Sequence, residues 1–476
     1  MVVGEMPEGV DLLVVGGGPG GYVAALAAAQ LGRKVVLVDA AGHEGLGGAC
    51  VNVGCIPSKA LIELANTFHG LESWAKRGLE TTNASLVHMD DFQKWKIEII
   101  DGLKDGVKQL LSHADVDIRT GHFRFTRPDQ GAVEFGDAPP SHIRFKSCVL
   151  ATGSRPAVLP NLVRDGIRVL DSTDVLALDE LPERIAIVGG GYIGVELGTA
   201  LAKLGSQVTI IEVAGTLLPS LGKAVGAPVI RRLTQLGVSV RINTTVLSDD
   251  GALLKVQNAN GEEETLDVDR IVVSIGRTPN TDDLGLDAIG VSADARGLLT
   301  PTLDLLITPR IAAIGDITPG PALAHKASSQ AHVAVDVLSG KARVFDPAAI
   351  PAVVFSDPEV AIVGLTLAEA QELKIDAEIA SFPIAASGRA RTLNENSGFA
   401  QWVYAGDGTV VGAQIVGPHA SEMIAEAALA IEMGANLEDI AETIHAHPTM
   451  GETLMEAARV GLGTPIHISP KKRLTR

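Results

Sequence analysis

The chain has 476 residues, 52 of them glycine, with 46% hydrophobic residues, 3% aromatic residues and a formal net charge of −18. This length predicts roughly three domains, and the composition is typical of a compact α/β protein with many tight turns, not of a disordered chain. Because the chain is strongly acidic, its charge argues against a nucleic-acid partner, and the basic residues in 471–476 are expected to form a solvated tail.

The expected compartment follows from what the sequence lacks. Residues 1–9 carry no cationic segment ahead of an apolar core, so they do not resemble an export signal. No uncharged apolar run approaches the roughly 18 residues that a membrane helix needs. The 3 cysteines cannot form a disulfide framework in so long a chain. We therefore expect a soluble cytoplasmic protein with no membrane contact.

The first elements along the chain predict a dinucleotide-binding fold. A short apolar strand, Asp11–Val15, leads directly into a glycine cluster that opens an alanine-rich helix, and the next strand ends at Asp39. In this pattern Gly16 makes the tight turn, Gly18 lets a pyrophosphate approach, and Gly21 lets helix and strand pack closely. The acid binds the ribose hydroxyls. A glycine cluster alone would be a weak signal.

The segment 47–59 carries the predicted redox centre. Cys50 and Cys55 could close a small disulfide ring, bracketed by glycines. Pro57 suits the first turn of a helix, so Cys55 is expected at a positive helix end with Lys59 one turn away, which lowers its thiol pKa. A zinc ligand pair or buried structural thiols are the alternatives, but a structural zinc site needs about four ligands and only Cys148 remains.

The next stretch predicts helices and then short strands. Residues 58–113 are expected to form a long helix, a polar interruption around Asn83, and a second helix from about Asp90. Residues 116–144 are expected to form short strands separated by proline turns. Cys148 follows in an apolar strand, where a lone cysteine is usually a packing residue.

A second glycine cluster repeats the first. The strand Arg184–Val188 leads into Gly189, Gly191 and Gly194, then a helix and a strand that ends at Glu212. The interval between the first glycine and the acid is the same in both copies, which makes coincidence an improbable explanation. The sequence therefore predicts two dinucleotide sites.

The two sites are expected to differ in use. The first lies directly before the cysteine segment, which suits a tightly held redox cofactor whose ring touches a sulfur. The second suits an exchangeable nicotinamide. Glu212 is followed by Val213 and Ala214 with no arginine nearby, so it would repel a 2′-phosphate and bind a free 2′-hydroxyl. This favours NAD over NADP.

The rest of the chain predicts three further strand ends of the same kind and then a region with a different pattern. Apolar strands end at 151–153, at Gly276 and at Asp316, whose carboxylate could bind a cofactor hydroxyl or serve as an ordinary turn residue. From residue 351, four segments alternate like antiparallel strands, and helices are expected near Ser421, Leu437 and Thr449. We therefore expect a separate C-terminal α+β domain. The alternating segments are Val353–Leu365, Ala377–Phe382, Phe399–Tyr404 and Val410–Val416.

With these residues in view, the chain resembles the flavin-dependent pyridine nucleotide-disulfide oxidoreductases, and within them the dihydrolipoamide dehydrogenase branch. The resemblance covers essentially the whole length, and the Cys-x4-Cys loop in this setting is highly specific. The matching segments are 16–21, 47–59, 151–156, 189–196, 276–280, 315–316, 355–361 and 445–452.

The resemblance implies an α/β architecture with two Rossmann-like domains and a C-terminal α+β dimerisation domain. The expected order is an FAD-binding domain (1–154), an NAD-binding domain (155–276), a central domain completing the FAD fold (277–350) and the interface domain (351–476). It further implies a homodimer with shared active sites, no metal, and a lipoylated carrier protein or domain as partner.

The resemblance also assigns roles to individual residues. Cys50 and Cys55 would form the redox disulfide, and His447, oriented by Glu452, would take a thiol proton across the dimer. Lys59 would lie near the flavin and pair with Glu196. The cofactor-binding residues expected in total are Gly16, Gly18, Gly21, Asp39, Gly48, Lys59, Thr152, Gly153, Asp316, Gly189, Gly191, Gly194, Glu196, Glu212 and Gly276.

Other interpretations stay open at this point. His447 could be a helix cap or a surface residue, and His445 could be a packing residue. A sibling reductase could act on another disulfide, such as glutathione, and a non-catalytic assembly subunit would keep the fold without turnover. The lipoyl carrier could also lie outside the 2-oxoacid dehydrogenase complexes. One departure from the family is Ser328-Ser329-Gln330, where acidic residues and glycine are usual.

Overall fold

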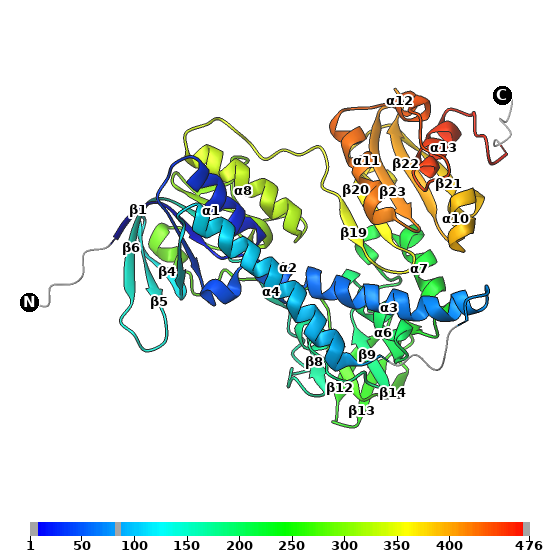
Figure 1. Ribbon diagram of the computed structural model, residues 1–476, viewed down its shortest axis with the longest axis horizontal. Helices are drawn as coiled ribbons and strands as arrows, with labels where there is room; N and C mark the ends of the chain where they lie inside the picture. The colour runs from blue at the N-terminus through cyan, green and yellow to red at the C-terminus, as the bar shows by residue number, and fades with distance from the viewer. Residues whose placement is uncertain (1–7, 81–86, 470–476) are drawn as a thin grey trace, which may run out of the picture.

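The computed structural model describes residues 8–80 and 87–469, without the side chain of Glu72. Figure 1 shows one lobe with the N-terminal strands, a second lobe below the centre, and a third lobe at upper right that contains the C-terminal helices. The polar interruption predicted around Asn83 and the basic tail 471–476 fall outside the described residues, as does most of the segment 1–9. The expected α/β class, with a separate C-terminal α+β unit, is confirmed.

The first lobe is built on a mostly parallel sheet in the order β17-β18-β6-β1-β2-β3. Its helices α1 and α8 pack together over one face, where they bury Leu12 and Val14 of the central strand. The opposite face is covered by the antiparallel strands β4 and β5, with Phe123 and Phe125 in contact. Cys148 lies fully buried in β6, as predicted for a packing residue. The elements are β1 (Glu8–Val15), α1 (Pro19–Gln30), β2 (Val35–Asp39), β3 (Asp117–Thr120), β4 (His122–Arg127), β5 (Gln130–Glu134), β6 (Ser141–Leu150), β17 (Leu306–Thr308), β18 (Ile311–Ala313) and α8 (Ala324–Leu338).

The second lobe contains the repeat of this fold. Its parallel sheet has the order β11-β10-β9-β15-β8, and a separate antiparallel meander, β12-β13-β14, packs beside it. The sheet residues Ile187 and Ile210 pack with Val195 of α6 and Val229 of α7 in one apolar cluster. The elements are β8 (Val169–Leu170), α5 (Ser172–Leu176), β9 (Arg184–Val188), α6 (Tyr192–Lys203), β10 (Gln207–Ile211), α7 (Lys223–Gln235), β11 (Ser239–Arg241), β12 (Thr245–Asp249), β13 (Leu253–Gln257), β14 (Glu263–Asp267) and β15 (Arg270–Val273).

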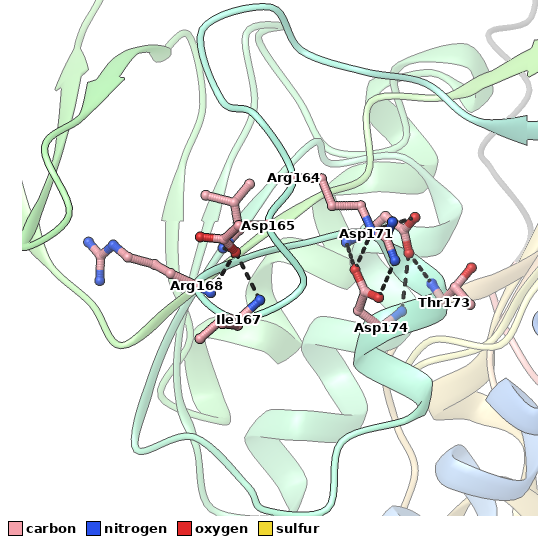
Figure 2. Close-up of polar contacts among 8 residues, drawn as sticks. Arg164, Asp165, Ile167, Arg168, Asp171, Thr173 and Asp174 are labelled. Carbon is pink, nitrogen blue, oxygen red and sulfur yellow. Dashed lines mark hydrogen bonds and ion pairs between the residues drawn. The ribbon is translucent and has the colours of Figure 1, made fainter.

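A polar loop leads the chain into the second lobe. It follows the short strand β7 (Ser154–Pro156), which pairs with β16 (Arg277–Pro279). Figure 2 shows Arg164 reaching Asp171 and Asp174, with Arg164–Asp174 distances of 2.6 Å. Asp171 also caps α5, because its carboxylate accepts hydrogen bonds from the Thr173 and Asp174 amides at 2.7 and 3.1 Å. This cap fixes the start of α5, which presents Ser172 to the pocket described below.

One short helix and two long ones, α2, α3 and α4, follow the first glycine cluster and its strands. α2 (Gly48–Asn52) and α3 (Cys55–Ala75) carry the cysteine segment, and α4 (Met89–His113) follows. Pro57 lies in the first turn of α3, as predicted. α3 packs along α6 of the second lobe, with Leu61 in the same apolar cluster as Leu201. No helix in 8–80 or 87–469 is long and apolar enough to cross a membrane.

The third lobe is an antiparallel sheet in the order β19-β20-β23-β22-β21. The single alternating segment predicted for Val353–Leu365 was wrong: the chain turns at 355–359 and forms two paired strands. Trp402 is fully buried in this sheet, and its indole donates to the carbonyl oxygen of Leu454 in α13 at 2.9 Å. The elements are β19 (Ala352–Val354), β20 (Val360–Gly364), β21 (Ala377–Pro383), β22 (Phe399–Ala405), β23 (Val410–Val416), α11 (Ala420–Glu432), α12 (Leu437–Glu442) and α13 (Glu452–Gly461).

Candidate active site

One pocket gathers most of the predicted site residues from segments that are far apart in sequence. It lies where the N-terminus of α1, the end of β2, the segment α2–α3 and the start of α6 meet, and the turn at Gly315–Ile317 closes another side. The predicted residues that line it are Gly16, Gly18, Asp39, Gly48, Cys50, Cys55, Lys59, Thr152, Gly153, Glu196 and Asp316.

The first glycine cluster has the geometry that its sequence predicts. Gly16 adopts φ +103°, a conformation that favours glycine, and a Cβ there would lie 2.3 Å from the Ala151 carbonyl oxygen. A Cβ on Gly21 would lie 1.7 Å from the Gly16 oxygen, so close helix–strand packing requires glycine. Asp39 accepts hydrogen bonds from the amides of Gly17 at 2.7 Å and Ala41 at 2.9 Å.

The second cluster has the same close glycine contacts and the same two hydrogen bonds to its acid. Gly189 has φ +115°, and a Cβ on Gly194 would lie 2.0 Å from the Gly189 oxygen. The Glu212 carboxylate accepts from the amides of Gly190 at 2.6 Å and Ala214 at 2.7 Å. Since its oxygens face backbone donors with no cation within bonding distance among the described residues, Glu212 is suited to a ribose hydroxyl and not to a phosphate.

The cysteine pair sits at the junction of two helices. Cys50 lies in α2 and Cys55 is the first residue of α3, and both are free thiols in the structure. A hydrogen bond from Cys50 lowers the pKa of Cys55, burial raises it, and the charge of Lys59 lowers it again, so that the pKa is about 7. The same pairing and its burial raise the pKa of Cys50. Cys55 is therefore the thiol that ionises first.

Lys59, which the sequence places one turn after Cys55, forms an ion pair at the pocket. Lys59 Nζ lies 2.8 Å from Glu196 Oε2, and the Glu196 side chain is only 5% exposed. Cys55 and Lys59 are separated by one helical turn of α3, so both side chains project to the same face, into the pocket. The ion pair thus joins the cysteine helix to α6 of the second lobe.

A polar chain lines the opposite wall. Ser154 Oγ donates to Asp316 Oδ2 at 2.6 Å, and Arg277 Nε donates to Ser154 Oγ at 2.7 Å. Thr152 Oγ1 donates to the Asn280 carbonyl oxygen at 2.6 Å. Asp316 is therefore a lining residue with a fixed partner, and Ser154, Arg277 and Asn280 are pocket residues that the sequence pattern alone did not single out.

His447 and Glu452 form a pair in a different part of the chain. His447 Nδ1 lies 2.9 Å from Glu452 Oε1, and Glu452 Oε2 accepts from the Thr449 amide at 2.9 Å. The His447 side chain is 76% exposed. Among the described residues, neither belongs to the pocket lining, and Figure 1 places α13 in the upper-right lobe, well away from α2. His445 instead contacts Glu426 at 2.8 Å, which raises its pKa.

Both glycine clusters leave open space in front of the helix that follows them. A Cβ on Gly191 would meet no protein atom within 4 Å, and one on Gly18 would meet only the Gly48 Cα at 3.7 Å. Both positions are the residues that directly precede α1 and α6, where backbone amides favour a pyrophosphate. The residues present therefore fit a dinucleotide at each cluster.

Comparison with known proteins assigns the family. The family model "Pyridine nucleotide-disulphide oxidoreductase" matches residues 10–331, and the dimerisation domain of the same family matches residues 350–458. The chain belongs to this family.

Relatives of this oxidoreductase include curated proteins of closely similar length. A protein of Geobacillus stearothermophilus named dihydrolipoyl dehydrogenase is 47% identical over 477 residues, which cover 99% of this chain and 100% of the relative. A protein of the same name from Halobacterium salinarum is 42% identical, with 98% and 99% covered.

Solved structures of the family share the fold of this chain. LpdA from Mycobacterium tuberculosis superposes with a TM-score of 0.86 at 26% identity, covering 94% of this chain and 99% of LpdA. The flavoprotein disulfide reductase RclA from Escherichia coli gives a TM-score of 0.84 at 26% identity, covering 96% and 100%. The predictions of an oxidoreductase that uses FAD and NAD, and of a dimerisation domain in the C-terminal lobe, are confirmed by these matches.

The remaining predicted residues lie outside the pocket lining. Gly21 and Gly194 act in helix–strand packing, and Gly276 follows β15 with φ +133°. Phe355 was missed as an individual residue: its amide donates to Glu196 Oε1 at 2.8 Å. Its only sequence signal was membership of the family-like segment 355–361.

Proposed function

We propose that this oxidoreductase reoxidises protein-bound dihydrolipoyl groups to the lipoyl disulfide and passes the electrons to NAD, in the cytoplasm. The observation that carries the proposal is the cysteine pair, with Cys55 tuned to ionise near neutral pH, inside a pocket lined by both nucleotide folds. Support for the substrate comes from relatives named dihydrolipoyl dehydrogenase that are 42% to 47% identical over nearly the full length.

The thiol chemistry starts from the Cys50–Cys55 disulfide. A substrate thiolate attacks the Cys50 sulfur, which forms a mixed disulfide and releases Cys55 as a thiolate. The second substrate thiolate then attacks the substrate sulfur, which releases lipoyl disulfide and leaves Cys50 reduced. Two electrons have entered the cysteine pair. Its low pKa makes Cys55 the better leaving group, and its place beside Lys59 stabilises the released charge.

We assign the proton transfers to His447 of the partner subunit. Histidine is suited to accept a thiol proton near neutral pH, and Glu452 holds its Nδ1 side, which leaves Nε2 for the substrate. In the single chain this pair is exposed and lies outside the cysteine pocket. A two-fold dimer that brings it to the pocket of the other subunit would complete the site.

Cofactor roles follow the two folds. Gly16, Gly18 and Asp39 would hold the FAD pyrophosphate and ribose, and the wall 152–153 with Gly48 and Asp316 would enclose it. Bound FAD supplies the two-electron exchange between the cysteine pair and NAD. Lys59, paired with Glu196, would place positive charge next to the cofactor ring.

The second fold would hold NAD. Gly189 and Gly191 would receive its pyrophosphate, Gly194 keeps α6 close to β9, and Glu212 would bind the adenosine ribose. Gly276, after β15, would border this site from the neighbouring strand. The free 2′-hydroxyl of NAD fits the Glu212 carboxylate, whereas a 2′-phosphate would be repelled.

The test is a substrate panel with the purified dimer. Dihydrolipoamide, a lipoylated carrier domain and reduced glutathione are offered with NAD or NADP, and the formation of NADH or NADPH is followed. We expect turnover with both dihydrolipoyl substrates and NAD, and at least about tenfold less with NADP or glutathione. Preferred turnover of glutathione, or a protein that retains no flavin, would overturn the proposal.

A further inference from the structure

The ammonium group of Lys59 is held from two sides. One side is Glu196 Oε2, at 2.8 Å, and the other is the aromatic ring of Phe355, whose centroid lies 4.4 Å from Lys59 Nζ. The face of an aromatic ring attracts a cation, and this attraction grows when the pair is shielded from water. Since the Lys59 side chain is 33% exposed, these contacts restrict an otherwise flexible group.

Phe355 also holds the other member of the ion pair. Its backbone amide donates to Glu196 Oε1 at 2.8 Å, which leaves Oε2 for Lys59. A charge-assisted hydrogen bond of this kind fixes the carboxylate plane. A single residue of the third lobe therefore contacts both groups of the pair that joins α3 to α6.

The segment that carries Phe355 is anchored by Asp357. Its Oδ2 lies 2.7 Å from Lys203 Nζ at the end of α6 and 3.0 Å from Arg232 Nη2 in α7. The side chains of Asp357 and Lys203 are 12% and 7% exposed. Lys203 also donates to Asn66 Oδ1 in α3, the helix of Lys59, at 2.7 Å. β19, which precedes this segment, contributes Val354 to the apolar cluster that contains Val229 of α7, and Figure 1 shows the two elements next to each other.

The ion pairs of Asp357 with Lys203 and Arg232 fix the position of the segment 355–359. Burial raises the pKa of Asp357, but the charges of Lys203 and Arg232 more than offset burial, so the net shift is downward. Glu395 faces the same cluster, and its pKa is raised by burial and by Asp357. Removing one partner of a buried pair leaves an uncompensated charge, so the segment 355–359 is held firmly against α6 and α7.

We propose that Phe355 and Asp357 are positioning residues for Lys59: Asp357 fixes the segment 355–359 on the second lobe, and Phe355 thereby holds the Lys59 ammonium beside Cys55. This inference rests on the proposed role of Cys55 as the thiolate of the reaction. It gives the C-terminal lobe a direct influence on the redox centre of its own chain, in addition to dimerisation.

The readout is the ionisation of Cys55. The titratable groups that act on it are Cys50 in α2, Lys59 in α3, and Glu196 and Tyr192 in α6. The holoenzyme carrying Cys50→Ser retains one thiol in the pocket, and serine can still donate a hydrogen bond to it. Its ultraviolet thiolate absorbance across pH, minus that of Cys50→Ser/Cys55→Ser, reports Cys55 alone, since both proteins contain the buried Cys148.

We expect Phe355→Leu in the Cys50→Ser protein to raise the Cys55 midpoint by about half a pH unit or more, because Lys59 is no longer held in place. Phe355→Tyr keeps the ring and should restore the midpoint of the parent protein. Asp357→Asn should shift the midpoint in the same direction by a smaller amount. Phe382→Leu, in the core of the same lobe, is the matched control and should leave it unchanged.

A double-mutant cycle separates positioning from general loosening. Lys59→Met should give the full shift, and adding Phe355→Leu to it should give no further shift. Equal effects of Phe355→Leu with and without Lys59, or an equal shift in Phe382→Leu, would overturn the inference. The long-wavelength thiolate–flavin absorbance of the same samples tests the proposed function separately: its absence at every pH would sink that function, whereas the cycle alone decides the role of Phe355.

Discussion

The two nucleotide folds of this chain have nearly the same local geometry and different surroundings. In each, the carboxylate at the end of the second strand accepts a hydrogen bond from the amide of the residue after the first glycine. The distance is 2.7 Å from Gly17 to Asp39 and 2.6 Å from Gly190 to Glu212. In each, the helix glycine packs against the turn with no room for a Cβ. The first fold continues into the cysteine helices, whereas the second continues into a meander, β12-β14.

The glycine cluster and its acid are therefore alike in both folds, and the segment that follows them differs. Only in the first fold does that segment bring cysteines next to the cluster. The first fold lies in the wall of the cysteine pocket through Gly16, Gly18 and Asp39. The second contributes residues of α5 and of the start of α6, among them Ser172, Tyr192 and Glu196, but none of its own glycine cluster and not Glu212. If the contrast holds, substitutions at the cysteines and substitutions at the second glycine cluster should have separable effects.

The largest effect is expected from removing the thiol that receives the substrate. Cys50→Ser should lower dihydrolipoamide oxidation by at least about 10³-fold, because no disulfide can form. Flavin content and NADH-driven reduction of the bound flavin should persist, since the second fold is untouched. Steady-state turnover and anaerobic reduction by NADH measure the two sides. Near-normal dihydrolipoamide turnover would contradict the contrast.

His447→Gln should affect the same side through proton transfer. We expect a loss of about 10² to 10⁴ in dihydrolipoamide oxidation, with flavin content and reduction by NADH unchanged. His445→Gln is the matched control because the His445 ring contacts Glu426, whereas the His447 ring contacts Glu452. A similar loss in both variants would point to a disturbed dimer interface, which sedimentation velocity would detect.

The glycines of the second fold separate packing from ligand binding. A Cβ on Gly194 would lie 2.0 Å from a carbonyl oxygen, so Gly194→Ala should lower the Tm by several degrees. Gly191→Ala meets no protein atom within 4 Å, so it should keep the Tm and raise the KM for NAD about tenfold or more. Calorimetry and kinetics measure both. Equal NAD affinity in Gly191→Ala and wild type would show that the pyrophosphate lies elsewhere.

The smallest effect is expected in the pH dependence of the ionisation of Cys55, which follows the first fold in the chain. The pKa of Cys55, lowered to about 7, means that its thiolate forms as pH rises through about 7 and is lost below it. The long-wavelength absorbance of dithiol-reduced enzyme should therefore rise to half its maximum near that pH. Reduction by NADH of the Cys50→Ser enzyme should not follow this midpoint. A midpoint near the ordinary thiol value of about 8.5 would show that Lys59 and Cys50 do not act on Cys55.

Much of the fold could be predicted because its signals are local. The glycine clusters, the alternating strands after residue 351 and the proline in the first turn of α3 each constrain the backbone within a few residues. One error arose where a turn interrupts a segment: Val353–Leu365 was predicted as a single segment, yet Pro358 and its neighbours divide it into two paired strands. The third C-terminal helix, expected near Thr449, begins at Glu452.

The two nucleotide folds and the place of the cysteine pair at the start of a helix could be predicted from the sequence alone, because each depends on residues within one contiguous unit. Other contacts between distant groups became known from the tertiary structure: Ser154 with Asp316, and Phe355 with both members of the Lys59–Glu196 pair that the family resemblance implied. These contacts depend on how the lobes pack, and packing arises from many buried side chains whose combined effect no single motif records.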